Sequence, residues 1–209
     1  MLFRIKSGGI YAFVYADKNI FMQWSILWQG RQNDSREHCL INSNESGIKV
    51  DSVIIGKQAD LIYRVEYSLL LDLNWQTLSF SISSLHNRVI QRIEYSSDGK
   101  GNWMDGDKPV PRLEGCLDID LPLTPFTNSL PINRLKQQIG QESDVRVIYI
   151  DLLAEKISPL TQKYKRTGEG EYHYQNVPND FEALIRTDHE GFVTDYPGLF
   201  LQSGCTRLE

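Results

Sequence analysis

Three side chains that could do chemistry share one face of a predicted strand near the middle of the chain. Cys116, Asp118 and Asp120 alternate there with aliphatic residues. Successive residues of a strand point to opposite faces, so the thiol and the two carboxylates project together. Such a set could supply a nucleophile and acid–base groups, or ligands for a metal ion.

The spacing of these residues favours a structural role instead. Alternate strand residues stand roughly 6.5–7 Å apart, which is wide for side chains that meet one ion. A nucleophilic Cys116 would need a base, and the histidines fall in predicted strand ends or turns, at His38, His86, His173 and His189. We therefore expect an inert, buried thiol, and two aspartates that accept hydrogen bonds from loop amides or pair with Arg112 or Arg134. No catalytic residue, metal ligand or cofactor site is assigned.

A second set of polar residues follows the strand directly. Prolines at 122, 125 and 131 predict a rigid loop there, without a regular strand or helix. In one interpretation, Thr124, Thr127 and Asn128 bond to their own backbone. In the other, the same side chains and Arg134 offer polar groups to a sugar or phosphate headgroup.

The elements that must position these residues are predicted to be strands. From Tyr63 to Trp75 the odd positions are all apolar or aromatic, which indicates a long strand with one buried face. Short strands also follow the central stretch, at 161–167, 171–175, 181–187 and 192–196, with turns between them. The segment Ile132–Gly140 has helical spacing, but the strand beginning at Arg146 favours a hairpin. The pattern predicts an all-β, antiparallel sandwich or barrel with few short helices.

Composition excludes several classes of protein. A net charge of −5 argues against a nucleic-acid surface. Three scattered cysteines indicate neither a disulfide framework nor a zinc site, and fit a reducing compartment. No apolar run approaches the roughly 20 residues of a membrane helix, and no signal peptide is recognisable. We expect a cytoplasmic protein, and oligomeric state is left open.

The first 21 residues are interpreted as an extension or a mis-assigned start, and residues 22–209 as the domain. Met1–Phe21 lacks turn signals and a matching strand pattern. Met22 offers a second start just before the regular strand pattern begins. We expect the segment to be dispensable, and a chain that begins at Met22 but fails to fold would contradict this.

The central stretch resembles the signature of the putative glycolipid-binding family of bacterial proteins. It reads GCLDIDL at 115–121 and TPFTNSLPINRL at 124–135. Agreeing landmarks lie upstream at Trp28, Trp75 and Trp103, and downstream at QKYKR (162–166), YHY (172–174) and DYPGLF (195–200). Asn133 stands where the family pattern has arginine, and Lys163 where arginine is common, so a clamp of two arginines is not expected here.

The resemblance implies a fold similar to the LolA/LolB lipoprotein carriers, a single highly curved antiparallel sheet like an unclosed barrel around an apolar cavity. Glycolipid binding is implied through that fold, and no catalytic residues carry over. The candidate ligand-binding residues are Thr124, Thr127, Asn128, Arg134, Trp103 and Tyr164. The motif residues with expected structural roles are Cys116, Asp118, Asp120, Pro125, Pro131, Tyr196 and Pro197.

Three hypotheses follow. The first is a soluble lipid or glycolipid binder whose apolar strand faces line a cavity for acyl chains, with the headgroup near Thr127, Asn128 and Arg134. The second is an enzyme for an amphiphilic substrate that uses the face carrying Cys116, Asp118 and Asp120. The third is an interaction scaffold whose curved sheet is filled by its own side chains or by those of a partner. The volume and lining of the interior discriminate among the three.

Overall fold

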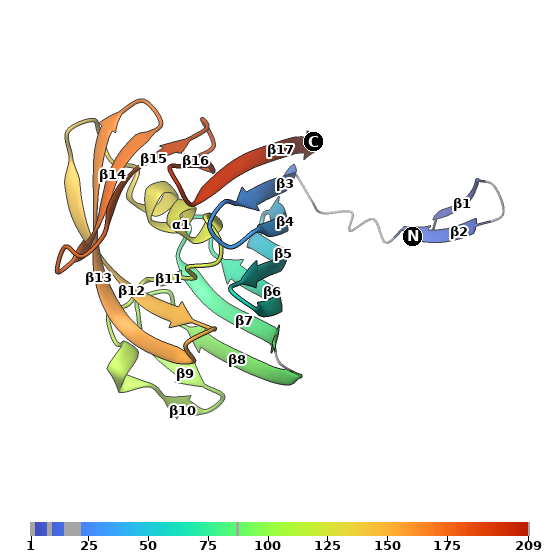
Figure 1. Ribbon diagram of the computed structural model, residues 1–209, viewed down its shortest axis with the longest axis horizontal. Coiled ribbons are helices and arrows are strands. Elements are labelled where there is room, and N and C mark those ends of the chain that lie inside the picture. The colour runs from blue at the N-terminus through green and yellow to red at the C-terminus, as the bar shows by residue number, and fades with distance from the viewer. Residues whose placement is uncertain (1–2, 8–9, 15–21, 87, 209) are drawn as a thin grey trace.

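One large, strongly curved sheet contains most of the chain in the computed structural model, which describes residues 3–7, 10–14, 22–86 and 88–208 (Figure 1). Its fifteen strands lie in the order β10-β9-β8-β7-β6-β5-β4-β3-β17-β16-β15-β14-β13-β12-β11. Their bounds are β3 Met22–Gly30, β4 Ser35–Asn44, β5 Gly47–Gln58, β6 Leu61–Leu71, β7 Thr77–His86, β8 Val89–Ser97, β9 Trp103–Asp105, β10 Lys108–Pro109, β11 Asp118–Asp120, β12 Glu142–Asp151, β13 Lys156–Gly168, β14 Glu171–Val177, β15 Glu182–Thr187, β16 Val193–Tyr196 and β17 Phe200–Leu208. A 3₁₀ turn, η1 (Pro111–Leu113), and one helix, α1 (Phe126–Leu135), complete these elements.

This architecture confirms the predicted fold class. The sheet curls on itself without closing, because β10 and β11 each end the order of strands. The strands β1 (Phe3–Ser7) and β2 (Ile10–Val14) form a separate antiparallel pair. The rest of the predicted extension 1–21 lies outside the described residues, so its dispensability stays a prediction.

The alternation of apolar and polar residues explains which face of β6 is buried. On β6 the buried positions are every second residue, from Tyr63 to Leu71. The strand predicted to reach Trp75 ends at Leu71, because the Asp72 carboxylate accepts the backbone N–H of Asn74 and of Gln76. Trp75 adopts a positive φ of 65° in that turn, which no strand allows.

The predicted loop after β11 is wrong: residues 126–135 form helix α1. Pro125 stands at its N-cap and Pro131 lies inside it, where the ring removes the bond to the Thr127 carbonyl. The helix lies in the crossover connection that β11 and β12 need because they pair in parallel, and such connections are usually helical. The hairpin predicted for Ile132–Gly140 is also wrong, because Ile132 to Leu135 form the last part of this helix.

The concave side of the sheet is filled by the chain itself. Seven consecutive residues of α1, from Phe126 to Ile132, are buried, and Figure 1 shows the helix inside the curl of the sheet. One apolar cluster joins β3–β7 to Phe126 and Leu130, and a second joins β12–β17 to Ile132. The described residues include no helix long and apolar enough to cross a membrane.

Candidate ligand pocket

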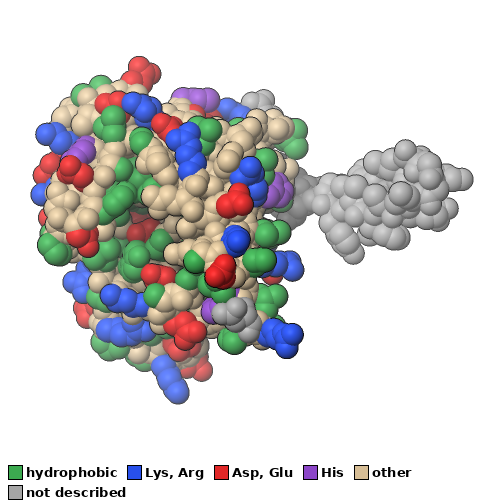
Figure 2. Space-filling model, viewed as in Figure 1, with side chains coloured by type: hydrophobic (Ala, Val, Ile, Leu, Met, Phe, Trp, Pro, Cys, Tyr) green, Lys and Arg blue, Asp and Glu red, His purple; other side chains and the backbone are tan. Residues whose placement is uncertain are grey.

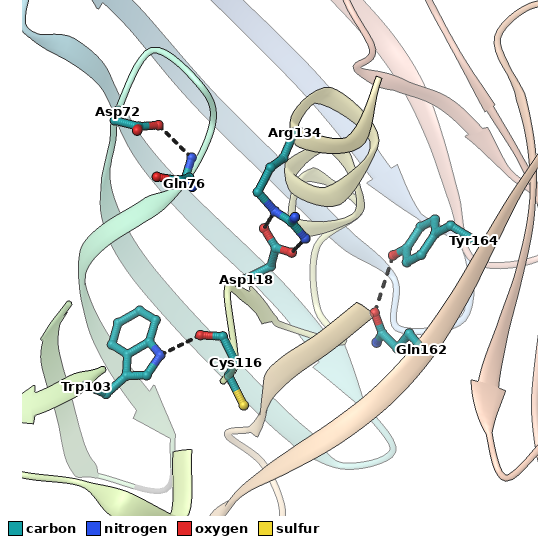
Figure 3. A network of polar contacts seen from close by, with 8 residues as sticks. All are labelled: Asp72, Gln76, Trp103, Cys116, Asp118, Arg134, Gln162 and Tyr164. Carbon is teal, nitrogen blue, oxygen red and sulfur yellow. Dashed lines mark hydrogen bonds and ion pairs between the residues drawn. The ribbon is translucent and has the colours of Figure 1, made fainter. Parts of the chain in front are cut away.

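Asp118 and Asp120 lie at opposite ends of the short strand β11 and have different surroundings. Asp118 is completely buried and accepts two hydrogen bonds from one guanidinium, with Arg134 Nε 3.1 Å from Oδ1 and Nη2 2.6 Å from Oδ2 (Figure 3). This bidentate pair ties β11 to the last turn of α1. Burial raises the pKa of Asp118, and the Arg134 guanidinium opposes that rise. The carboxylate is therefore a structural one.

Asp120 turns instead toward a pocket between β11 and the β12–β17 half of the sheet. Its Oδ2 accepts the Gln162 side-chain amide at 2.6 Å, and its Oδ1 accepts the Thr127 hydroxyl at 3.4 Å. No salt bridge to this carboxylate is found within the described part of the chain. Burial raises the pKa of Asp120 to about 6, although both hydrogen bonds lower it.

The pocket beside Asp120, here called the tyrosine pocket, has a volume of about 280 Å³. Its walls come from the loop after β11, from α1 and from five strands, and it is lined by Asp120, Leu121, Pro122, Thr124, Asn128, Tyr149, Tyr174, Asn176, Phe181, Tyr196, Leu199 and Phe200. Figure 2 shows a hollow on this face, with hydrophobic side chains around it and an acidic one at depth. The lining thus combines aromatic rings, amides and a single carboxylate.

The aromatic walls are fixed by contacts among themselves. Tyr174 lies 5.2 Å from Tyr164, 6.1 Å from Phe181 and 6.2 Å from Tyr196, measured between ring centroids. Its hydroxyl donates to the Asn176 side-chain oxygen at 2.8 Å. Burial, followed by the charge of Asp120, raises the pKa of Tyr174 and of Tyr196, so both remain neutral phenols.

A buried acid lies behind the pocket wall. Glu37 on β4 accepts the hydroxyls of Ser52 at 2.7 Å and Tyr67 at 2.6 Å. Burial raises its pKa to about 7, while hydrogen bonds from Thr124, Tyr67 and Ser52 lower it. Thr124 links this network to the pocket, because its hydroxyl also lies 3.4 Å from that of Tyr67.

The structure brings four of the six candidate ligand residues to the tyrosine pocket. Thr124 and Asn128 line it, Thr127 bonds to Asp120, and Tyr164 accepts the Asn128 amide at 2.9 Å just behind the wall. The other two lie elsewhere. Arg134 is engaged with Asp118, and Trp103 is a core residue whose indole N–H donates to the Cys116 carbonyl at 2.8 Å (Figure 3).

The motif residues divide in the same way. Tyr196 lines the pocket, and Pro197 is exposed in the turn between β16 and β17. Cys116 is buried, and burial raises the pKa of its thiol, which makes it a poor nucleophile at neutral pH. Arg112, the other candidate partner of the aspartates, donates to the Ile157 carbonyl instead. Within the described ranges, no three His, Cys, Asp or Glu side chains are placed to share a metal ion.

Most of the aromatic wall of the pocket was not predicted from the sequence. Tyr149, Tyr174 and Phe181 come from segments far from the central stretch in sequence, and only the curvature of the sheet brings them to Asp120. Tyr172 and Tyr174 alternate with His173, so period-2 patterning could have indicated that both point inward. The same alternation, applied to β4, would have placed Glu37 on the buried face with Cys39 and Ile41.

A larger cavity of about 500 Å³ lies at the other end of α1. It opens beside Asn133 and carries Lys136, Arg166 and His189 together with Glu169 and Asp188, so its charges are mixed. The Arg166 guanidinium there already donates to the carbonyls of Gln137 and Gly168. The tyrosine pocket, with its single carboxylate and aromatic walls, is therefore the better defined site.

Comparison with known proteins agrees with the sequence pattern. A family model described as "Putative glycolipid-binding" matches residues 25–202, which include every residue of the tyrosine pocket. The chain belongs to this family. The match confirms the resemblance of the central stretch, and it covers the large sheet except for residues 22–24 of β3 and residues 203–208 of β17.

A solved structure supports this membership of the glycolipid-binding family. It is a DUF1089 family protein from Pseudomonas aeruginosa, 32% identical, with a TM-score of 0.73 over 80% of this chain and 91% of that one. A second structure, a β-barrel-like protein of the DUF1849 family from Brucella abortus, is 7% identical, with a TM-score of 0.47 over 91% of this chain and 98% of that one. No curated protein gives a significant match.

Proposed function

We propose that this glycolipid-binding family member binds the sugar headgroup of a glycolipid in the tyrosine pocket, without transforming it. The observation that carries the proposal is the carboxylate of Asp120 in an aromatic pocket of about 280 Å³. Ligand sites commonly combine apolar walls with a few polar groups that fix orientation, and this lining has that composition.

The polar side of the pocket suits a ligand rich in hydroxyl groups. An ionised carboxylate offers about four lone-pair sites, and Asp120 accepts one bond at each oxygen from the protein. Two sites are left for donors from a ligand. Asn128 and Asn176 add amide groups to the same lining, and hydrogen bonds to a charged acceptor are stronger than neutral ones.

The aromatic side suits the C–H face of a sugar ring. Tyr174, Phe181 and Tyr196 are held in mutual contact, so their rings offer apolar area with little loss of conformational entropy on binding. Phe181 is 38% exposed and stands at the rim. One face of a pyranose could lie on these rings while its hydroxyls point to Asp120.

The size of the pocket favours a headgroup over a whole lipid. At about 30 Å³ for each water molecule in the liquid, 280 Å³ corresponds to about nine waters, which suits one monosaccharide. The sequence led us to expect apolar strand faces around an acyl chain. The concave side is instead packed with α1 and two core clusters, so the structure gives no support to an acyl cavity inside the sheet.

The chemistry of the lining favours binding over hydrolysis. Most enzymes that cleave glycosidic bonds use two carboxylates, roughly 5 to 9.5 Å apart, on either side of the bond. Asp120 is the one acidic residue among those that line this pocket. The other two members of the proposed catalytic face do not reach the pocket. Cys116 is buried in the core, and Asp118 is paired with Arg134.

Asp120→Asn is expected to weaken binding about 10- to 100-fold, since a hydrogen bond to a charged group contributes roughly 1.5–3 kcal/mol. Titration calorimetry with methyl and octyl glycosides of glucose, galactose, mannose and N-acetylglucosamine would measure the effect. Asp144→Asn is the matched control, because Asp144 is an exposed aspartate of β12 outside the pocket. If no glycoside in the panel binds the unaltered protein, the proposal fails.

The Asp120 carboxylate should make sugar binding depend on pH, and Asp120→Asn should remove this dependence. Asp120 accepts hydroxyl donors best when ionised, and its pKa is about 6. Affinity should therefore fall about tenfold between pH 7.5 and pH 5, as the carboxylate takes up a proton. In Asp120→Asn the affinity should be flat over this range. A pH dependence that persists in the variant would assign the effect to another group, for example Glu37, which has a pKa of about 7 and shares a hydrogen bond with Thr124 of the pocket lining.

A further inference from the structure

Exposed aliphatic side chains gather at one end of four neighbouring strands, β5 to β8 (Figure 1). Strand pairing places three of them in one row on the outer face of the sheet, which reads across the four strands as Ile55, Arg64, Leu85 and Ile90. Ile62 belongs to the next pair on the same face, opposite Lys57 and nearer the β5–β6 turn. These four aliphatic side chains are 43% to 69% exposed. They form a contiguous group, here called the aliphatic patch, and contiguous apolar surface commonly marks an interaction site.

Basic residues surround the aliphatic patch. The exposed charged residues in its row, in the next row and in the adjoining turns are five basic ones, Arg36, Lys57, Arg64, Arg88 and Arg92, and three acidic ones, Asp34, Asp60 and Glu66. Arg64 pairs with Glu66. Across the described part of the chain, no ion pair involves Lys57, Arg88 or Arg92. The surroundings of the patch are therefore positive, although the chain as a whole carries a net charge of −5.

The aliphatic patch lies at the same end of the sheet as the tyrosine pocket. Gln58 and Leu61, on either side of the β5–β6 turn, line a shallow hollow together with Pro122, and Pro122 also lines the tyrosine pocket. The β7–β8 turn lies at this end too, because His86 pairs with Tyr63, two residues from Leu61. A surface in contact with these two turns would therefore lie beside the tyrosine pocket.

An anionic lipid surface complements both parts of this region. Aliphatic side chains at the ends of hairpins can enter the boundary between lipid headgroups and acyl chains, where they gain free energy by leaving water. The basic residues around them meet the negative potential of anionic headgroups. Stable attachment to a membrane usually takes two such signals, and the patch with its surroundings supplies an apolar and a basic one.

We propose that the aliphatic patch docks this protein on an anionic lipid surface, with the β5–β6 and β7–β8 hairpin ends against the headgroups. The choice of a lipid surface as the occupant rests on the proposed function, because a glycolipid is itself a component of such a surface. Docking at this end of the sheet brings the tyrosine pocket close to the sugars that the surface displays. The protein would thus meet its ligand in place.

The test is sedimentation of the full chain with lipid vesicles at low salt. One set of vesicles contains equal parts of phosphatidylcholine and phosphatidylglycerol, the other contains phosphatidylcholine alone, and neither contains a glycolipid. The unaltered protein should sediment with the anionic set and stay in solution with the neutral set. High salt should release it, because salt screens interactions between exposed charges.

Two double variants remove the two signals separately. Arg88→Gln with Arg92→Gln should lower the partition coefficient roughly 25-fold, because each basic residue near an anionic surface contributes about fivefold. Ile62→Thr with Ile90→Thr should lower it about tenfold by removing aliphatic surface. Threonine keeps the β-branched shape that suits a strand, so both positions should remain folded.

Matched controls change the same residue types at exposed positions away from the patch. Lys108→Gln with Lys165→Gln removes two positive charges from β10 and β13. Leu70→Thr with Leu73→Thr removes two exposed leucines at the opposite end of β6. Both controls should sediment like the unaltered protein.

Each other outcome separates the docking surface from the headgroup pocket. If the unaltered protein sediments with neither set, the docking surface is overturned, while binding of methyl glycosides in solution would still support the pocket. Unchanged sedimentation of both patch variants would place the lipid contact elsewhere and overturn the patch. Self-association in ultracentrifugation that Ile62→Thr with Ile90→Thr abolishes, without vesicle binding, would assign the patch to a second copy of the chain. Vesicle binding through the patch without glycoside binding would leave the docking surface and overturn the headgroup assignment.

Discussion

Arg134→Met is expected to lower the free energy of unfolding by about 3–5 kcal/mol, the usual cost of removing one partner of a buried ion pair. Asp118 has no solvent exposure, and its carboxylate accepts two hydrogen bonds from this guanidinium, at 2.6 and 3.1 Å. Methionine keeps much of the length of the side chain but offers no donor. Urea denaturation at pH 7.5, compared with the unaltered protein, measures the loss.

A double variant separates the lost charge pair from lost packing. Asp118→Asn combined with Arg134→Met leaves no buried charge and should recover most of the stability. The loss in Arg134→Met alone should also be smaller at pH 5 than at pH 8. The pKa of Asp118 is already raised by burial, and removing Arg134 raises it further. A group with a raised folded pKa regains stability as pH falls toward that pKa. A loss below 1 kcal/mol at pH 8 would mean that Asp118 finds water or another donor.

Phe126→Ala is the second large effect, with an expected loss of about 3–5 kcal/mol and a fall in Tm of roughly 10 °C. The ring begins helix α1, is completely buried, and lies 6.5 Å from each of the rings of Trp28, Tyr67 and Phe192. Truncation leaves a cavity where the helix meets the curved sheet, and the surrounding strands can close it only in part. Differential scanning calorimetry would record the shift.

Two controls accompany this variant. Phe126→Leu should cost less, because it removes fewer buried atoms. Ile90→Ala, at a side chain that is 61% exposed on β8, should change stability by less than about 0.5 kcal/mol. If Phe126→Ala were as harmless as Ile90→Ala, α1 would not be the packed centre of the sheet.

Local patterning predicted the strands well because the signal for a strand with one buried face is local. The alternation from Tyr63 to Leu71 is a property of neighbouring residues, and the structure places each odd position inside. Helix α1 was missed because Pro125 and Pro131 argue against a helix within their own segment. Burial on all sides overrides that preference, and burial depends on strands far away in the chain.

The candidate site was predictable in part for the same reason. The sequence offered Arg112 and Arg134 as partners of the two aspartates, and the structure pairs Arg134 with Asp118. The sequence could not predict that Asp118 and Asp120 have different environments, because both lie on the same face of the predicted strand. What distinguishes them is that Tyr174 and Tyr196 surround one aspartate and α1 covers the other. Those tyrosines reach Asp120 through the order of strands, which a single sequence does not determine.

The structure also changes the balance among the three hypotheses. Core packing around α1 agrees with a sheet filled by its own side chains, which was the scaffold hypothesis. The ties of Asp118 to Arg134 and of Asp120 to Gln162 and Thr127 weaken the enzyme hypothesis. We propose binding outside the core, where the family membership and the tyrosine pocket point to the same class of ligand.

The most direct test of the central claim is a crystal structure of the protein grown with a saturating octyl glycoside, using the sugar that binds best in calorimetry. The proposal predicts a pyranose in the tyrosine pocket, with hydroxyls within hydrogen-bond distance of Asp120 and one ring face on Tyr174 or Tyr196. A glycoside bound elsewhere, for instance in the larger cavity beside Asn133, with the tyrosine pocket empty of sugar, would contradict it.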